Sequence, residues 1–408
     1  MQLVAYGAQD IYLTGNPQIT FFKVVYRRHT NFSMEAIEQT LNGTVSNGAN
    51  ISATVSRNGD LVGRMYVEFN PNTLFKTTSN LSGDAGDVVT SNVGNTLLKS
   101  VELEIGGQQI DKHYSHWLTT YAELTESNPT GANKEISTTG GQPSEATLYQ
   151  KMSYNHDGRT HINTDGTNNA PSKAFVPLQF WFNRNPGLAL PLIALQYHEV
   201  KVKIEFCQVI DFALENGGGA ANCDIKNGDI KLWADYIYLD TDERRRFAQV
   251  SHEYLIEQLQ YESKTGLALE LNFNHPVKEL IWTGAPTDPG AHSGPGTPGV
   301  FSSPKNWHIK LNGHDRFEKR DYRYFTRTQI WQHHTGYGGT TAPDSIAVYS
   351  FALKPEEHQP SGTCNFSRID NAQLITDGGA TDTSYNVYAV NYNVLRIMSG
   401  MGGLAYSN

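Results

Sequence analysis

Three residues in a short aromatic stretch of this sequence have the types and spacing of a metal site. Asp111, His113 and His116 offer one carboxylate and two imidazoles, which are common ligands of zinc. No cysteine or glutamate stands beside them to complete a set of four ligands, and both histidines follow an alternating strand pattern. The sequence therefore indicates histidines that pack at the end of a strand, and we expect neither a metal ion nor another cofactor.

Two further patterns suggest chemistry that their surroundings do not support. Residues 294–299 have the glycine spacing of a dinucleotide-binding loop, but two prolines remove backbone amides and prevent the helix that must follow. Asp240 and Asp242 could serve as the paired carboxylates of a glycosidase, yet capping of a helix explains them equally well. Since the chain also has no nucleophile elbow and no phosphate-binding loop, we expect no catalytic residues.

The overall charge argues against a protein that coats nucleic acid. The 408 residues include 32 lysines and arginines and 41 aspartates and glutamates, which gives a net charge of −9. Neutralising phosphates requires the opposite sign, so we expect no direct contact with nucleic acid. Three scattered cysteines are too few for a disulfide framework and should stay unpaired. With no secretory signal and no apolar run of the ~18–20 residues that a membrane helix needs, we expect synthesis in the cytoplasm.

Alternating strands dominate the chain. The segment 199–206 places Val200, Val202, Ile204 and Phe206 on one face and charged side chains on the other. Such strands cover a core with one face and meet water with the other, as they do in antiparallel sandwiches. Long loops rich in Gly, Asn, Ser and Thr separate them. The pattern predicts an all-β fold, and the same period recurs at 51–55, 101–105 and 267–273.

The two halves of the chain resemble each other. Residues 103–114 match residues 309–322 around a glycine turn, which places Gly107 and Gly313 in corresponding positions. Two matches in the same order favour a duplicated β-sandwich. The second match lies further along each half and joins residues 180–186 with residues 349–355.

One clear helix pattern separates these halves. Asp240 or Thr241 can cap the first amides, acidic residues occupy the first turn, and three arginines follow at 244–246. We interpret the arginines as a solvated or interdomain helix face. The boundary between the two sandwiches is therefore expected at this helix.

The segment from Tyr6 to Phe32 resembles the N-terminal signature of a known family. Its sequence Tyr6-Gly-Ala-Gln-Asp-Ile-Tyr-Leu-Thr-Gly-Asn-Pro17 is similar to that of the major capsid proteins of nucleocytoplasmic large DNA viruses, most closely those of algal viruses. Further blocks that resemble the same family follow in order along the chain, at 105–114, 186–200, 246–260, 271–276, 359–371 and 391–408.

The resemblance implies a structural role with two consecutive eight-stranded jelly rolls and a few short helices. Three subunits would form a pseudo-hexagonal homotrimeric capsomer, and capsomers would tile the icosahedral shell of a large double-stranded DNA virus in the host cytoplasm. The implied partners are neighbouring capsomers, minor capsid proteins and a penton protein at the vertices, with the internal membrane contacted only indirectly. The chain then divides into an N-terminal arm with the first strand, a first jelly roll, a connecting helix and a second jelly roll, at 1–32, 33–240, 241–252 and 253–408.

The N-terminal arm combines aromatic residues with a basic cluster in an otherwise acidic chain. Pro17 separates residues 1–14 as a peptide too short to fold alone. Exposed aromatic side chains at this density promote aggregation unless another surface covers them. The resemblance implies that this end faces the particle interior, so we expect it to order against minor capsid proteins or neighbouring capsomers. The candidate contact residues are Tyr12, Phe21, Phe22, Arg27 and Arg28.

The residues by themselves also allow a β-sandwich that binds carbohydrate or processes glycans, because tyrosine and tryptophan rings can stack on sugars. Such a protein would bind sugar as a monomer, whereas a capsid scaffold would form a stable trimer without turnover. N-glycosylation sequons are present but are weak signals in a chain without a visible secretory signal. The candidates are Asn42, Asn50 and Asn80.

Overall fold

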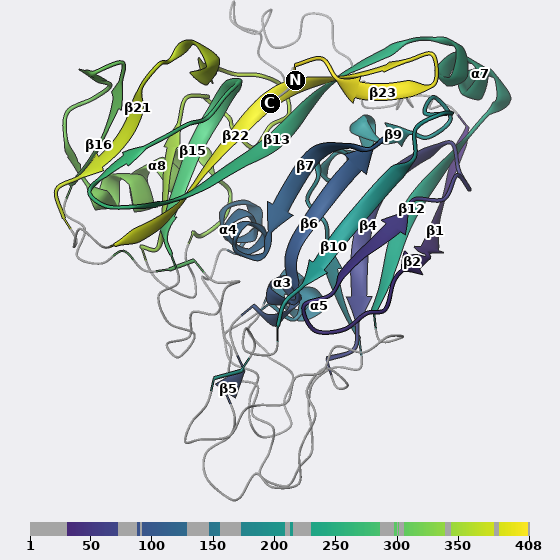
Figure 1. Cartoon of the computed structure of the whole chain (residues 1–408), viewed down its shortest axis with the longest axis horizontal. Coiled ribbons are helices and arrows are strands. Elements are labelled where there is room, and N and C mark those ends of the chain that lie inside the picture. The colour runs from purple at the N-terminus through teal and green to yellow at the C-terminus, as the bar shows by residue number, and fades with distance from the viewer. Residues whose placement is uncertain are drawn as a thin grey trace, which may run out of the picture.

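Two β-sandwiches form the part of the chain that the computed structural model describes (Figure 1). They lie side by side, and helix α7 (Thr241–Gln249) lies at the far edge of the first sandwich. From there strand β13 (His252–Thr265) runs across to the second sandwich. The predicted all-β fold is confirmed. The described residues are 31–71, 92–128, 147–155, 173–208, 230–285, 298–299, 301, 306–338, 344–378 and 383–406, with the backbone alone at 88–89 and 213–214.

The first sandwich consists of two antiparallel sheets, here called sheets I and II. Sheet I has the order β1–β12–β4–β8, with β9 on β4, and sheet II has the order β2–β3–β10–β6–β7. The strands of sheet I are β1 (Phe32–Gln39), β12 (Ile230–Leu239), β4 (Leu61–Phe69), β8 (Ala174–Pro177) and β9 (Leu190–Pro191). Those of sheet II are β2 (Leu41–Asn42), β3 (Asn50–Thr54), β10 (Val200–Phe206), β6 (Leu98–Ile105) and β7 (Gln108–Tyr114). A separate pair joins β5 (Val88–Val89) to β11 (Ala213–Leu214).

The second sandwich repeats this plan in sheets III and IV. Sheet III has the order β13–β22–β15–β19, with β20 on β15 and β23 on β22, and sheet IV has the order β14–β21–β16–β17, with β18 on β16. Beside β13, sheet III contains β22 (Ser384–Met398), β15 (Pro276–Gly284), β19 (Ile346–Ser350), β20 (Cys364–Asn365) and β23 (Met401–Leu404). Sheet IV contains β14 (Ala268–Glu270), β21 (Ala372–Thr376), β16 (Asn306–Leu311), β17 (His314–Asp315) and β18 (Arg320–Asp321).

Short helices connect the strands. Helix α7 begins where predicted, because the Asp240 side chain accepts a hydrogen bond from the Thr241 amide at 2.8 Å. The Arg244 guanidinium lies 2.9 Å from Asp60 and ties α7 to the first sandwich. No helix in the described ranges is long and apolar enough to cross a membrane. The others are α3 (Val93–Leu97), α4 (Ser115–Thr125), α5 (Leu148–Ser153), α6 (Trp181–Arg184), α8 (Gln329–His333), η1 (Pro186–Leu188), η3 (Tyr324–Thr328) and η4 (Phe366–Arg368).

The repeat noted in the sequence is a repeated hairpin in the structure. Between β6 and β7, Gly106 and Gly107 have φ angles of 59° and 86°, and between β16 and β17, Asn312 and Gly313 have φ angles of 51° and 80°. Two consecutive positive φ angles are typical of a type I′ turn, which favours Asn and Gly and suits the twist of a two-residue hairpin. Both hairpins therefore turn in the same way.

Sheets I and III correspond strand by strand as well. Strands β4 and β15 both have nine residues and both lie third in their sheets. In sheet I, Tyr66 of β4 faces Trp233 of β12, and in sheet III, Ile281 of β15 faces Tyr388 of β22. Both of these pairs have side chains on the outer face of their sheet, because their chain neighbours belong to the cores.

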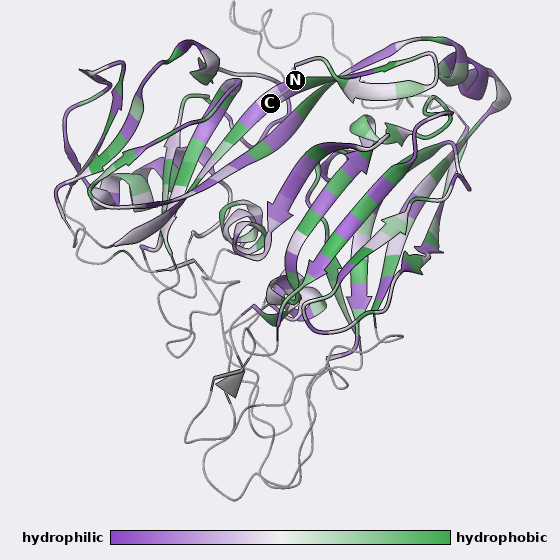
Figure 2. Cartoon of the chain, viewed as in Figure 1, coloured by the Kyte–Doolittle hydropathy of each residue, from purple (hydrophilic) through white to green (hydrophobic). Residues whose placement is uncertain are grey.

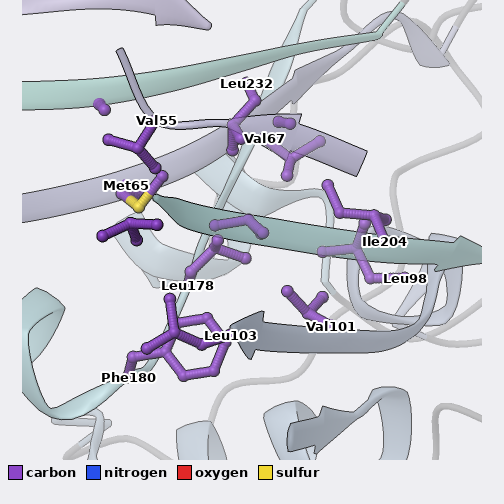
Figure 3. Packing of buried hydrophobic residues seen from close by; sticks show 14 of the residues in the cluster. Val55, Met65, Val67, Leu98, Val101, Leu103, Leu178, Phe180, Ile204 and Leu232 are labelled. Atoms are coloured by element: carbon purple, nitrogen blue, oxygen red, sulfur yellow. The ribbon is translucent and has the colours of Figure 1, made fainter. Parts of the chain in front are cut away.

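Alternation along the strands builds both cores, as the bands of hydrophobic and hydrophilic residues in Figure 2 show. In β10 the four apolar residues predicted to face inward are buried, and the charged residues between them are partly exposed. Mostly aliphatic side chains from both sheets fill the first core, and aromatic residues such as Phe180 pack among them (Figure 3). The second core is more aromatic. The ring centroids of Trp282 and Trp307 lie 5.7 Å apart, and those of Trp307 and Tyr385 lie 5.2 Å apart.

Candidate functional site at the junction of the two sandwiches

Helix α4 provides the apolar part of the contact between the sandwiches. Leu118 belongs to the first core, whereas Trp117 and Leu124 pack against the outer face of sheet III and are only 4% and 0% exposed. An outer sheet face normally meets water, so an apolar patch there marks a contact surface. The residues of sheet III in this cluster are Ile281, Ile346, Val348, Tyr388 and Val390.

Tyr388 is the centre of an aromatic cluster at this contact. Its hydroxyl lies 2.5 Å from Nδ1 of His116, and its ring centroid lies 5.1 Å from that of Trp117 and 5.4 Å from that of Tyr261. Burial lowers the pKa of His116 to about 3, so this imidazole is neutral at physiological pH. His116 is therefore a packing residue of the junction.

The other residues of the suspected metal site have separate protein partners. His113 Nε2 lies 3.0 Å from Asp111 Oδ2, and the His113 ring stacks on Phe180 at 4.7 Å. The second oxygen of Asp111 accepts a hydrogen bond from the Leu259 amide at 3.0 Å and so reaches across to β13. Over the ranges that the structure describes, no three His, Cys, Asp or Glu side chains gather as metal ligands. Asp111 and His113 thus join the two sandwiches.

A buried ion network forms the charged part of the junction. Glu257 of β13 is 3% exposed, and its carboxylate lies 2.8 Å from Arg184 Nη2 and 2.9 Å from Lys278 Nζ. Burial alone raises the pKa of Glu257, but Arg184, His358 and Lys278 outweigh it and hold the pKa well below its usual range. Arg184 belongs to α6 of the first sandwich and also donates to the Tyr121 hydroxyl at 3.0 Å. The network therefore spans both sandwiches.

Close backbone contact fixes the junction at a second place. The Gly336 amide donates to the Leu124 carbonyl at 2.7 Å, and the Gly338 amide donates to the Glu123 carbonyl at 2.9 Å. A Cβ atom on Gly336 would lie 2.3 Å from the Glu123 carbonyl oxygen, so no side chain fits there. The end of α4 and the segment after α8 are thus locked together.

His334 is held at the end of α8 between two carboxylates. Its Nε2 lies 3.0 Å from Glu279 Oε2, its Nδ1 lies 3.1 Å from Glu356 Oε1, and its side chain is 2% exposed. Burial alone lowers the pKa of His334, but Glu279 and Glu356 outweigh it and raise the pKa to about 9. His334 is therefore a cation at neutral pH and binds α8 to sheet III.

The hairpin of β22 and β23 returns to the first sandwich. Leu395 and Ile397 of β22 belong to the first hydrophobic core, as does Ile256 of β13. The Tyr197 amide donates to the Gly400 carbonyl at 2.9 Å, and the Gly402 amide donates to His198 Nδ1 at 3.1 Å. The two sandwiches thus share a junction and also part of one core.

The described residues do not include the contact candidates chosen from the sequence. Tyr12, Phe21, Phe22, Arg27 and Arg28 lie outside the described residues, as does Asn80. Asn42 at the end of β2 and Asn50 at the start of β3 are exposed, so both sequons reach the surface. Cys207 is buried, Cys364 is partly buried, and Cys223 lies outside the described residues.

Apart from Asp111, His113 and His116, the residues that form the junction were not recognised from the sequence. A signal for one of them was present, because Lys278 and Glu279 interrupt the otherwise apolar strand β15, and charged residues in a buried strand need partners. Arg184 and Glu257 gave no such signal, since each lies in a segment with other polar residues.

Comparison with known proteins decides what this junction belongs to. A family model described as the N-terminus of major capsid proteins matches residues 20–240, and one described as large eukaryotic DNA virus major capsid protein matches residues 243–403. The major capsid protein of Pyramimonas orientalis virus is 50% identical over all of this chain and 99% of its own length. The chain belongs to the major capsid proteins of large eukaryotic DNA viruses. The family resemblance seen in the sequence is confirmed.

Other relatives and a solved structure agree. The major capsid protein of Paramecium bursaria Chlorella virus 1 is 44% identical over all of this chain and 99% of its own length. The crystal structure of PBCV-1 VP54, fitted into a reconstruction of the virophage Sputnik, has a TM-score of 0.76 at 38% identity. The structural match covers 95% of this chain and 100% of the VP54 chain. The predicted double jelly roll is confirmed by this match and by the four antiparallel sheets.

Family membership indicates that the junction has a structural role. A major capsid protein builds the icosahedral shell of the virion from copies of itself, so its function is structural rather than enzymatic. The carbohydrate-binding alternative is thereby set aside. In such a protein the apolar, charged and backbone contacts described above do no chemistry on a substrate. They hold two sandwiches at one fixed angle.

Proposed function

We propose that three copies of this chain form a closed homotrimer, in which six sandwiches make a pseudo-hexagonal capsomer. The observation that carries this proposal is the duplicated pair of sheets, I and III, held together by a buried junction. The two sandwiches of one chain are similar, so the edge of one sandwich resembles the edge of the other. When each copy contacts the next through such edges, the heterologous contacts close into a ring. As part of this proposal, the chain divides into jelly rolls at 33–240 and 253–408, joined by 241–252.

Sedimentation of the purified protein tests the trimer. We expect a species with three times the 45.3 kDa chain mass that persists at micromolar concentration, since obligate interfaces commonly bury more than ~2,000 Å². A sugar-binding monomer is the matched alternative, so the same sample is examined with and without oligosaccharide. A lone 45 kDa species under all these conditions would contradict the proposal.

The partners beyond the trimer follow from the same role. Neighbouring capsomers, minor capsid proteins and a penton protein at the vertices would contact this protein, with the internal membrane reached only through such partners. The net charge of −9 supports a shell that does not touch the genome directly. We propose that synthesis and assembly take place in the host cytoplasm.

Deleting residues 1–14 tests whether the N-terminal arm serves these partners. We expect the trimer and its melting temperature to be unchanged and shell assembly to be impaired, because the arm is proposed to order only against other proteins. A matched variant with Arg27→Glu and Arg28→Glu keeps the length of the arm and should weaken assembly by charge reversal alone. Failure of the shortened chain to trimerise would show instead that the arm belongs to the subunit core.

A further inference from the structure

The two sandwiches carry helices in corresponding places. Helix α4 follows the first repeated hairpin, and η3 with α8 follows the second. Leu118 of α4 enters the first core and Phe325 of η3 enters the second, so these two residues correspond. With this alignment, the face of α4 formed by Trp117, Tyr121 and Leu124 corresponds to a face formed by Tyr324, Thr328 and Trp331.

The face on α4 is covered, whereas on the second helix Tyr324 is half-buried against the second core and Trp331 is open to solvent. Trp117 and Leu124 are buried against sheet III of the same chain. Trp331 is 82% exposed, and Leu353, which follows β19, is 76% exposed. Leu353 is the counterpart of Arg184 in the second sequence match, and its carbonyl lies 3.1 Å from His333 Nδ1 at the end of α8. Two large apolar side chains exposed on neighbouring segments, the end of α8 and the turn after β19, mark a contact surface.

Sheet I offers the surface that corresponds to sheet III. Its outer face carries an aromatic cluster of half-buried rings, in which Tyr66 stacks on Trp233 at 6.5 Å and meets Phe175 edge-on at 5.9 Å. On sheet III the corresponding outer pair, Ile281 and Tyr388, is the pair covered by α4. Sheet I therefore has an aromatic patch in the place where sheet III is occupied.

The pairing of the strands predicts which residue replaces Glu257 in this second contact. Glu257 lies four residues before Tyr261, which faces Tyr388 on β22. On sheet I, Glu38 faces Trp233, and the residue four positions earlier is Met34, which is 55% exposed. The ion pair of Arg184 with Glu257 inside one chain is thus matched by two apolar residues, Leu353 and Met34.

We propose that the Trp331 and Leu353 surface docks on the outer face of sheet I of a second copy of this chain. This inference rests on the proposed homotrimer and specifies its interface. Trp331 contacts the aromatic outer face of the neighbour's sheet I, which carries Tyr66 and Trp233, and Leu353 packs beside Met34 of the neighbour. Because donor and acceptor surfaces differ, the contact is heterologous and passes from each copy to the next until the ring closes. The contact within a chain uses the charged pair of Arg184 and Glu257, whereas the contact between chains uses the apolar pair of Leu353 and Met34. A charged surface does not fit an apolar one, so neither contact can replace the other.

Introducing a negative charge at the exposed tryptophan tests the docking surface. Trp331→Glu should raise the concentration at which the trimer dissociates by at least about tenfold, because central tryptophans are the side chains that most often dominate interfaces. Leu148→Glu is the matched control, since Leu148 is 83% exposed on α5, outside the proposed contact, and should leave the trimer intact. Circular dichroism of both variants should match that of the unchanged protein. A Trp331→Glu protein that trimerises as well as the control would overturn the docking surface.

Cross-linking tests the pairing itself. A chain with both Leu353→Cys and Met34→Cys, treated with a short bismaleimide, should give covalent dimers and trimers on a denaturing gel. Each single variant should remain at the mass of one chain. Double-variant trimers that show no additional cross-linked species would refute the pairing while leaving the trimer in place. A wild-type protein that sediments only as a monomer would instead refute the proposed function, and the docking surface with it.

Discussion

Replacing Glu257 by glutamine should lower the free energy of unfolding by about 3–5 kcal/mol. The change leaves the guanidinium of Arg184 and the ammonium of Lys278 buried without a counter-charge, although the shape of the side chain is kept. Desolvated charges that have lost their partner are among the most destabilising features in a protein interior. Urea unfolding at neutral pH and fixed protein concentration measures the loss, since the stability of an oligomer depends on concentration.

A surface ion pair on the same strand provides the control for this experiment. Glu253 lies 2.8 Å from Arg396, and both side chains are exposed. Glu253→Gln should therefore change the free energy of unfolding by less than about 1 kcal/mol. Equal effects of the two substitutions would show that the buried network contributes no more to the free energy of unfolding than an exposed ion pair does. The triple variant Arg184→Met, Glu257→Leu, Lys278→Met should recover stability, because removing all three charges leaves none unpaired.

Raising the pH from 6.5 to 9 should weaken the folded protein by about 3 kcal/mol through His334 alone. The pKa of His334 is raised from 6.5 to about 9 on folding, so its contribution to stability is complete below pH 6.5 and disappears as the pH passes 9. Above that pH the neutral imidazole leaves Glu279 and Glu356 without the cation between them. Melting temperatures between pH 6 and 10 report the change.

A neighbouring histidine gives the comparison. His334→Gln should flatten the fall of melting temperature between pH 6.5 and 9 and lower stability at pH 6. His333→Gln changes the preceding residue, whose Nδ1 lies 3.1 Å from the Leu353 carbonyl oxygen, and should retain the slope of the unchanged protein. If the slope is the same in all three proteins, His334 is not the group responsible.

The sequence was sufficient to predict the sheets, but it was not sufficient to predict the junction. Alternation in β10 is a local property, so Val200 to Phe206 could be assigned to a core without knowing the rest of the fold. The glycine pair at 106–107 and Asn312 with Gly313 likewise determine a turn locally. The junction depends on residues far apart in the chain, such as Arg184 and Glu257, whose proximity no local pattern reports.

Exposure is equally hidden from the sequence. Trp117 and Trp331 both lie on helices with one core-facing side, and a helical pattern cannot tell whether the other side meets a second sandwich or solvent. Charge and family resemblance in the sequence indicate the aromatic arm residues as contact candidates. Nothing in the sequence indicates that Trp331 on α8 is exposed.

The return of β22 to the first sandwich sets an order of events during synthesis. Leu395 and Ile397 complete a core whose other members, such as Leu103 and Val202, leave the ribosome far earlier. Until those late residues arrive, the first sandwich exposes part of its interior and remains open to chaperones and proteases. A chain cut short before β22 therefore lacks part of its first core as well as strands β22 and β23 of sheet III.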